Sequence, residues 1–179
     1  MIASHLFRLL ALPGIVMHEL AHYCFCCLVG ARVHQVVYFS FGSPAGYVVH
    51  TVPKKLRGHF AIVAGPFLIN SALAFLLFLA SAPVLREVVQ GEALPTVGAL
   101  LHLIAMLWLG LTIALQALPS ATDAASLWDV TGRHVRRGNL FALIGFPLAA
   151  ALALANALRT IWVDWLYAFW LFWLALQLT

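Results

Sequence analysis

The sequence predicts an all-α polytopic membrane protein with about five transmembrane helices and one short β-hairpin. Of its 179 residues, 64% are hydrophobic and 9% are charged, which is too little charge to cover the surface of a soluble domain of this size. The apolar residues gather in runs of about membrane-spanning length, separated by short polar stretches. After the first run comes a stretch of β-branched and aromatic residues that is too short and too broken for a spanning helix.

The first apolar run covers residues 6–29 and carries the pentapeptide His18-Glu19-Leu20-Ala21-His22. Polar residues inside the run, with no small-residue cleavage site after it, predict that it is not a cleavable signal peptide. Pro13-Gly14 predicts a kink just before the pentapeptide, and Gly30 predicts the end of the helix.

The stretch over residues 31–55 predicts two short strands around a turn at residues 42–46. An open sheet edge cannot lie in bare lipid, because its backbone groups would have no hydrogen-bond partners. We therefore expect this hairpin at the cytoplasmic interface, between the first and second transmembrane helices, or buried within the protein.

Four further apolar runs follow the hairpin, at residues 59–81, 94–118, 140–158 and 161–178. The second run contains a lone Asn70, and the third ends at Pro119, shortly before Asp123. A polar loop is expected over residues 82–93, and a basic loop is expected after Asp123. Trp162, Trp165 and Tyr167 in the last run indicate an interfacial aromatic belt.

Orientation follows from the basic residues. Seven of the ten Lys and Arg residues lie in the loops after the first and third runs: Arg32, Lys54, Lys55, Arg57, Arg133, Arg136 and Arg137. The opposite side carries Arg8, Arg86 and Arg159. The positive-inside rule then places the N-terminus outside, and the pentapeptide, the hairpin and Asp123 toward the cytoplasmic side. These scattered charges indicate contact with anionic lipid headgroups and exclude nucleic acid as a partner.

The pentapeptide matches the pattern HExxH. On a helix this spacing puts His18 and His22 on one face, one turn apart, where both can bind one zinc ion. Glu19 then lies beside the metal and can take a proton from water. Ionisable residues inside a membrane-length apolar run are costly unless they face a protein interior, which favours a metal site over a polar surface.

Catalytic zinc usually has three protein ligands, and Asp123 is the preferred third ligand. Its alternative role is to cap a short helix that starts at Ala124. Asp129 is expected to pair with Arg133 or Arg136 instead. The remaining candidates for the third ligand are four histidines of the same side: His34, His50, His59 and His134.

The sequence leaves two possible roles open for Asn70 and for the three cysteines. Asn70 either joins helices by hydrogen bonding or points a polar group at the site. Cys24, Cys26 and Cys27 are expected to be small packing residues without disulfides, and soft metal ligands are their alternative role.

HELAH in the first run, the hairpin, Ala64-Gly65-Pro66 with Asn70, and Pro119 with Asp123 together resemble the site-2 protease family of intramembrane zinc metalloproteases. The resemblance covers residues 6–129 and departs from the family at Gln116, at Ala124 and in the spacing before Asn70, as in a divergent minimal member. It implies one zinc ion held by His18, His22 and Asp123, with Glu19 as the general base. Asn70 would match a polar position of the second span.

The resemblance implies a single integral membrane domain, with a protease-like core of three spans at 1–129 and two added spans at 138–179. The expected activity is endopeptidase cleavage of transmembrane protein substrates. The hairpin edge at Gly46, Tyr47, Val48 and Val49 either pairs with the unwound substrate as an added strand or packs at the membrane surface. The alternatives to an enzyme are a transition-metal transporter or sensor, and an inactive protease-like scaffold.

Overall fold

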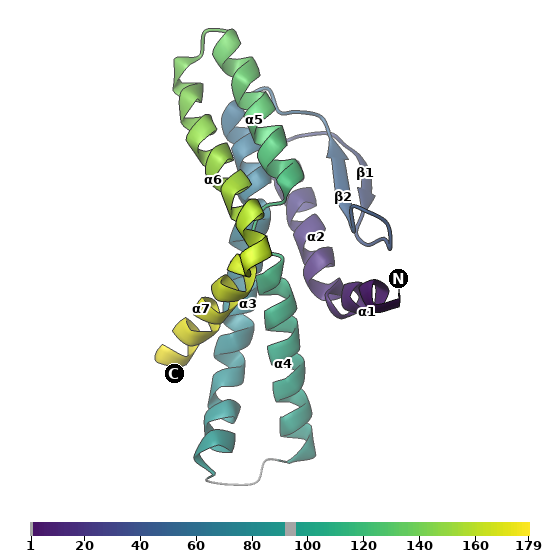
Figure 1. Ribbon diagram of the computed structural model, residues 1–179, viewed down its shortest axis with the longest axis vertical. Helices are drawn as coiled ribbons and strands as arrows, with labels where there is room; N and C mark the ends of the chain where they lie inside the picture. Colours follow the sequence, from purple (N-terminus) through teal and green to yellow (C-terminus); the bar gives the residue numbers. More distant parts are fainter. Residues whose placement is uncertain (1, 92–95) are drawn as a thin grey trace.

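A computed structural model of the protein describes residues 2–91 and 96–179, and it is mostly helical with one two-stranded sheet. This confirms the predicted fold class at the level of secondary structure. The helix α3 forms the long axis of the molecule and packs against α2, α4, α5 and α7 (Figure 1). In chain order the elements are α1 (Ile2–Leu10), α2 (Leu12–Leu28), β1 (Val33–Val37), β2 (Tyr47–His50), α3 (Leu56–Gln90), α4 (Val97–Leu115), α5 (Ala121–Arg136), η1 (Leu140–Ile144), α6 (Gly145–Ala157), η2 (Leu158–Ile161) and α7 (Val163–Gln177).

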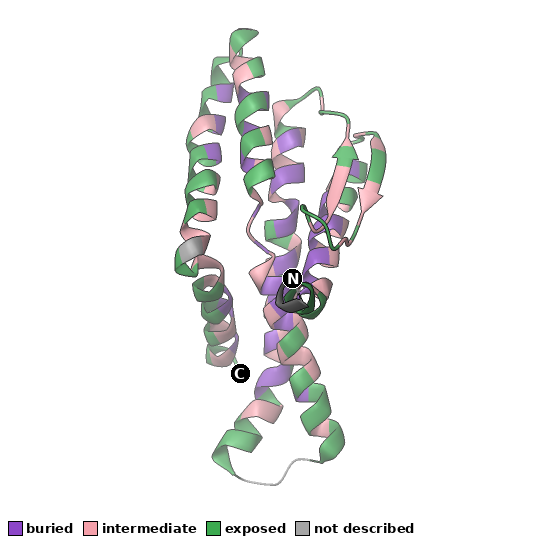
Figure 2. Ribbon diagram, turned by 45° about the vertical axis from the view of Figure 1, so that its right-hand side comes forward, coloured by how far each residue is buried: buried purple, intermediate pink, exposed green. Residues whose placement is uncertain are grey.

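Three helical segments are long and apolar enough to cross a membrane, namely α3, α4 and the continuous stretch Leu140–Ala157. The helix α2 is apolar but has 17 residues, and α7 has 15. Buried residues line the middle of α3 and the neighbouring α2, whereas much of the outer surface is exposed (Figure 2). Many of the exposed side chains are large and apolar, as lipid-facing helices require.

The first apolar run is two helices and not one bent helix. The chain turns at Ala11, so that α1 lies across the start of α2 (Figure 1). Pro13 falls in the first turn of α2, where backbone N–H groups have no acceptor within the helix. A proline there costs the helix no hydrogen bond. The predicted kink at Pro13-Gly14 is therefore displaced to Ala11. Gly30 follows the last helical turn with φ 69°, as a helix-terminating glycine does.

The predicted loop at residues 82–93 is wrong for the part that the structure describes. The helix α3 continues through Pro83 to Gln90 and ends at Gly91, which has φ 69°. Pro83 removes one backbone hydrogen bond from α3. The helix nevertheless continues through the apolar residues after it, Leu85, Val88 and Val89. Residues 92 and 93 of that loop, and the predicted start of the third run at Leu94, lie outside the described residues.

The predicted basic loop after Asp123 is also wrong, because these residues form α5. Its last turn carries Arg133, His134 and Arg136. Positive side chains there interact favourably with the negative, carbonyl end of the helix dipole. The expected pairing of Asp129 with Arg133 or Arg136 does not occur. Within residues 2–91 and 96–179 the ion pairs are those of Asp123 with two histidines.

The β-hairpin is confirmed. Strands β1 and β2 are antiparallel, with Val36 opposite Val48 and Val37 opposite Tyr47, and an irregularity lies between Val33 and Gln35. The hairpin contacts α2 on the side away from α6 (Figure 1). This placement brings the residues that precede β2 over the middle of α2.

Candidate metal centre

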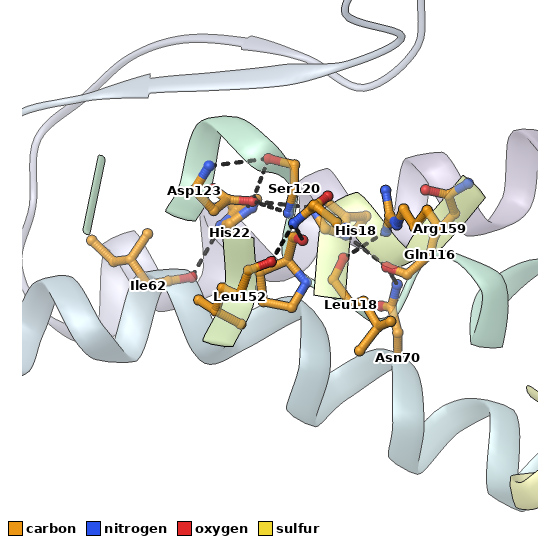
Figure 3. A network of polar contacts seen from close by, with 12 residues as sticks. His18, His22, Ile62, Asn70, Gln116, Leu118, Ser120, Asp123, Leu152 and Arg159 are labelled. Carbon is orange, nitrogen blue, oxygen red and sulfur yellow. Dashed lines mark hydrogen bonds and ion pairs between the residues drawn. The ribbon is translucent and has the colours of Figure 1, made fainter. Parts of the chain in front are cut away.

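Two buried histidines and one half-buried aspartate, from two distant helices, converge at the middle of the molecule. His18 and His22 lie one turn apart on α2, and each is 7% exposed. Nε2 of His18 lies 3.8 Å from Oδ2 of Asp123, and Nε2 of His22 lies 3.4 Å from Oδ1 of the same carboxylate. Both rings point at Asp123 at the start of α5 (Figure 3). The three residues predicted as ligands are thus brought together.

The other ring nitrogen of each histidine is held by a backbone carbonyl. Nδ1 of His18 lies 2.7 Å from the carbonyl oxygen of Gln116, and Nδ1 of His22 lies 3.0 Å from that of Ile62. A carbonyl oxygen can only accept, so Nδ1 must carry the proton in each ring. A neutral imidazole then presents an unprotonated Nε2, which is the form that binds a metal.

The two acceptor carbonyls are free for different reasons. The carbonyl of Ile62 lies inside α3, where its helical donor would be residue 66, and Pro66 has no N–H. The carbonyl of Gln116 is free because the chain breaks between α4 and α5. Helix α4 ends at Leu115 and α5 begins at Ala121, which leaves carbonyls of the connecting residues without helical donors. Besides His18, Asn70 Nδ2 donates to Gln116 at 3.0 Å. Two side chains near the end of α6 satisfy the next carbonyls: Asn156 donates to Pro119 at 2.8 Å, and Arg159 donates to Leu118 at 3.0 Å (Figure 3).

The predicted capping role of Asp123 is corrected in position, because Asp123 is the third residue of α5 and not its N-cap. Ser120 is the N-cap of α5, and its backbone N–H donates to Oδ2 of Asp123 at 2.7 Å in a capping box. Helix α5 therefore begins at Ala121, and the capping residue is Ser120. The same carboxylate faces His18 and His22.

The three side chains could hold a metal ion. The three ligand atoms lie within 4.8 Å of one another. Tetrahedral zinc with ligand distances of about 2.0–2.1 Å places its ligand atoms about 3.3 Å apart. The 3.4 and 3.8 Å contacts are to different oxygens of Asp123, and a separation of up to 4.8 Å among the ligand atoms would have to shorten by about 1.5 Å to reach that geometry. Two neutral imidazoles and one carboxylate are also a ligand set that zinc accepts, although other divalent metals share this preference.

Glu19 borders the same buried space. A cavity of about 240 Å³ lies between α2, the hairpin and the α4–α5 break, and Glu19, which is 8% exposed, lines it together with His18, His22 and Asp123. Gly46 covers Glu19 closely. A Cβ at this glycine would lie 2.6 Å from Cγ of Glu19 and 3.0 Å from the carbonyl oxygen of Val37. Glu19 therefore lies under the hairpin, at the wall of the cavity that the three candidate ligands also line.

The other predicted hairpin residues divide into two groups. Tyr47 and Val48 line the cavity with Gly46, whereas Val49 is 44% exposed and does not line it. Of the alternative third ligands, His50 lines the cavity and His59 is buried against Ser126, at 3.1 Å. Among the described residues, neither joins the three-residue cluster. The cysteines also stay outside it, and Cys26 packs as a buried residue.

Sequence reasoning missed three residues of the site. Gln116, Asn156 and Arg159 support the α4–α5 break, and Gln116 and Arg159 also line the cavity. Arg159 was counted as a loop charge, and it lies in η2 at the cavity wall. Asn156, a lone amide in an apolar run, is the one sequence signal that could have drawn attention to this region.

Comparison with known proteins finds no matching family model, no matching curated protein and no matching solved structure.

Proposed function

We propose that this protein is an intramembrane zinc metalloendopeptidase that cleaves membrane-embedded segments of protein substrates. One observation carries the proposal. The carboxylate of Asp123 faces the Nε2 atoms of both HExxH histidines, and Glu19 lines the same buried cavity. Zinc-dependent hydrolysis requires three protein ligands, a carboxylate base and room for a water molecule, and the cavity of about 240 Å³ offers that room.

Each residue then has a distinct role. His18 and His22 supply Nε2 lone pairs, and Asp123 supplies a carboxylate that also anchors the start of α5. A bound zinc ion would polarise the scissile carbonyl and make water acidic enough to deprotonate near neutral pH. Glu19 takes the proton from water and delivers it to the leaving amine.

The substrate is a transmembrane segment that must unwind to expose a backbone carbonyl. Strand β2 pairs with β1 on one edge, and Tyr47 and Val48 border the cavity. Its other edge is available within the two-stranded sheet to bind an unwound segment as an added strand. A hairpin that merely packs at the membrane surface is the alternative role.

The proposed topology has five spans, with the N-terminus outside and the site toward the cytoplasmic side. Support comes from the basic residues on one end of the molecule, where the start of α3 meets η1 and the end of α5. In this arrangement α2 is a short span that packs against α3, and a bilayer that thins around it would match its length. Helix α7 follows α6 in the same direction along the molecule (Figure 1), so a fifth span requires α7 to turn back within the membrane.

Cleavage of an internally quenched peptide tests this function. The peptide would have about 20 apolar residues, a central Gly-Gly pair and terminal fluorophore and quencher, in detergent with the purified protein. The wild type is expected to cleave it, and a chelator is expected to stop cleavage. Glu19→Gln should abolish cleavage while zinc content stays near that of the wild type.

Three outcomes would contradict the proposal. Unchanged product formation by Glu19→Gln would remove the general base from the mechanism. A wild type that binds zinc but cleaves nothing would favour a transition-metal transporter or sensor, since such a protein needs the ligands but no proton acceptor. A wild type that binds no metal would favour a scaffold.

A further inference from the structure

A groove on the basic end of the molecule combines positive charge with apolar walls. It has a volume of about 530 Å³ and lies between the start of α3, the end of α5 and η1. Lys54, Lys55 and Arg57 line it on one side. Phe60, Phe141 and Ile144 are among its apolar lining residues, and Phe141 is 89% exposed.

The positive charge of this groove is not neutralised by the protein. Among the described residues, the lining contains no Asp or Glu, and the ion pairs of the chain involve Asp123 alone. A second cavity, of about 820 Å³, shares Lys54, Lys55 and Arg57 and again has no acidic residue among its described lining. Three cations around one apolar-walled groove therefore have no protein counter-charge nearby.

The position of the groove matches the headgroup level of a bilayer. Helix α3 has 35 residues, so it is about 52 Å long at about 1.5 Å per residue. A bilayer is about 30 Å thick in its hydrocarbon core and about 40–45 Å with headgroups. A membrane crossed by α3 must place the first residues of α3 at or just beyond the headgroups. The apolar side of the groove then continues along Leu140–Ala157, which is long and apolar enough to span.

We infer that this groove binds one anionic phospholipid, with its phosphate at Lys54, Lys55 and Arg57 and its acyl chains along Phe141 and Ile144. Charge selects the headgroup, since each cation near an anionic lipid contributes favourably. The exposed apolar wall selects a lipid over a soluble phosphate. The inference depends on the proposed membrane embedding and is independent of proteolysis.

The test is lipid binding by native mass spectrometry of the full-length protein in neutral detergent. The probes are dioleoyl phosphatidylglycerol, dioleoyl phosphatidylcholine and glycerol phosphate. The wild type should bind one phosphatidylglycerol at least about tenfold more tightly than phosphatidylcholine. The double variant Lys54→Gln with Lys55→Gln should bind phosphatidylglycerol about 30-fold more weakly.

The matched control is Arg136→Gln with Arg137→Gln. It removes the same amount of charge from the same end of the molecule, but neither arginine lines the groove. A loss below about threefold in this control supports a site in the groove. Equal losses in the two double variants would overturn the inference in favour of general surface attraction. Equal binding of both lipids, or glycerol phosphate binding as tightly as phosphatidylglycerol, would also overturn it.

Discussion

Nε2 of His22 lies 3.4 Å from Oδ1 of Asp123, although the two residues come from helices that begin far apart in the chain. The contact places a carboxylate where a metal ion bound to the histidine would need its third ligand. It also ties the position of α5 to that of α2, so the metal centre depends on how the chain breaks after α4.

Asp123→Ala is expected to lose zinc. The substitution removes the one carboxylate among the described residues that joins the two histidines, and two imidazoles alone bind zinc weakly. Elemental analysis after purification without chelator should give about one zinc per chain for the wild type and well below that for Asp123→Ala and His22→Ala.

Asp129→Ala is the matched control, because Asp129 lies on the same helix but contacts neither histidine. It should keep the zinc content of the wild type. Zinc retained in Asp123→Ala would move the third ligand elsewhere, and His50, which lines the same cavity, would be the next residue to substitute.

Asn70→Leu is expected to weaken zinc binding without touching a ligand. Asn70 donates to the carbonyl of Gln116, which also holds Nδ1 of His18. Loss of a group that bonds a ligand directly typically costs about 10–100-fold in metal affinity, and Asn70 is one bond further out, so a loss of about tenfold or less is expected. Titration against chelators of graded zinc affinity would measure the change.

Ser71→Ala provides the comparison for Asn70→Leu. Ser71 is the next residue on α3, and its hydroxyl lies 2.6 Å from the hydroxyl of Tyr167 on α7, away from the metal centre. It should leave zinc affinity unchanged. If both variants weaken zinc binding equally, the effect comes from the packing of α3 and not from the carbonyl of Gln116.

Gly46→Ala is expected to slow cleavage while zinc stays bound. Its new Cβ would lie 2.6 Å from Cγ of Glu19, so either the hairpin or the general base must move. Gly42→Ala tests the same loop at a position where a Cβ meets the hydroxyl of Ser40, at 3.2 Å. Turnover of the quenched peptide should fall in the first variant and remain near wild type in the second. Full turnover in Gly46→Ala would show that Glu19 does not need this close cover.

The HExxH part of the site could be predicted because it depends on local geometry. A spacing of four residues on a helix puts His18 and His22 on one face whatever surrounds the helix. Asp123 could be chosen as a ligand, but spacing could not decide between ligation and capping. The structure shows that one carboxylate does the capping from position N3 and also faces both histidines.

The hydrogen bonds that satisfy the carbonyls between α4 and α5 could not be predicted, because they come from helices distant in the sequence. Asn156 and Arg159 reach the carbonyls of Pro119 and Leu118 only after α6 has folded back along α5. The positive-inside rule counts Arg159 as a loop charge, whereas its guanidinium is used to satisfy a backbone group. The length of α3 was also predicted wrongly. A proline such as Pro83 often ends a helix, but α3 tolerates it and continues.

Prolines in β2 test whether the hairpin binds substrate as an added strand. Consecutive N–H groups along a strand point to opposite edges, so one of Val48→Pro and Val49→Pro removes a donor from the free edge of β2. At least one of them should lower turnover of the quenched peptide while zinc content is unchanged. Full turnover in both would rule out strand addition and leave the hairpin as a packing element.

Val36→Pro separates strand addition from folding of the hairpin. Val36 lies on β1 opposite Val48, so a proline there perturbs the hairpin without removing a donor from the free edge of β2. Turnover close to wild type in Val36→Pro, with a loss in one β2 variant, would locate the effect at the free edge. An equal loss in Val36→Pro would instead trace the requirement to the hairpin that holds Gly46 over Glu19.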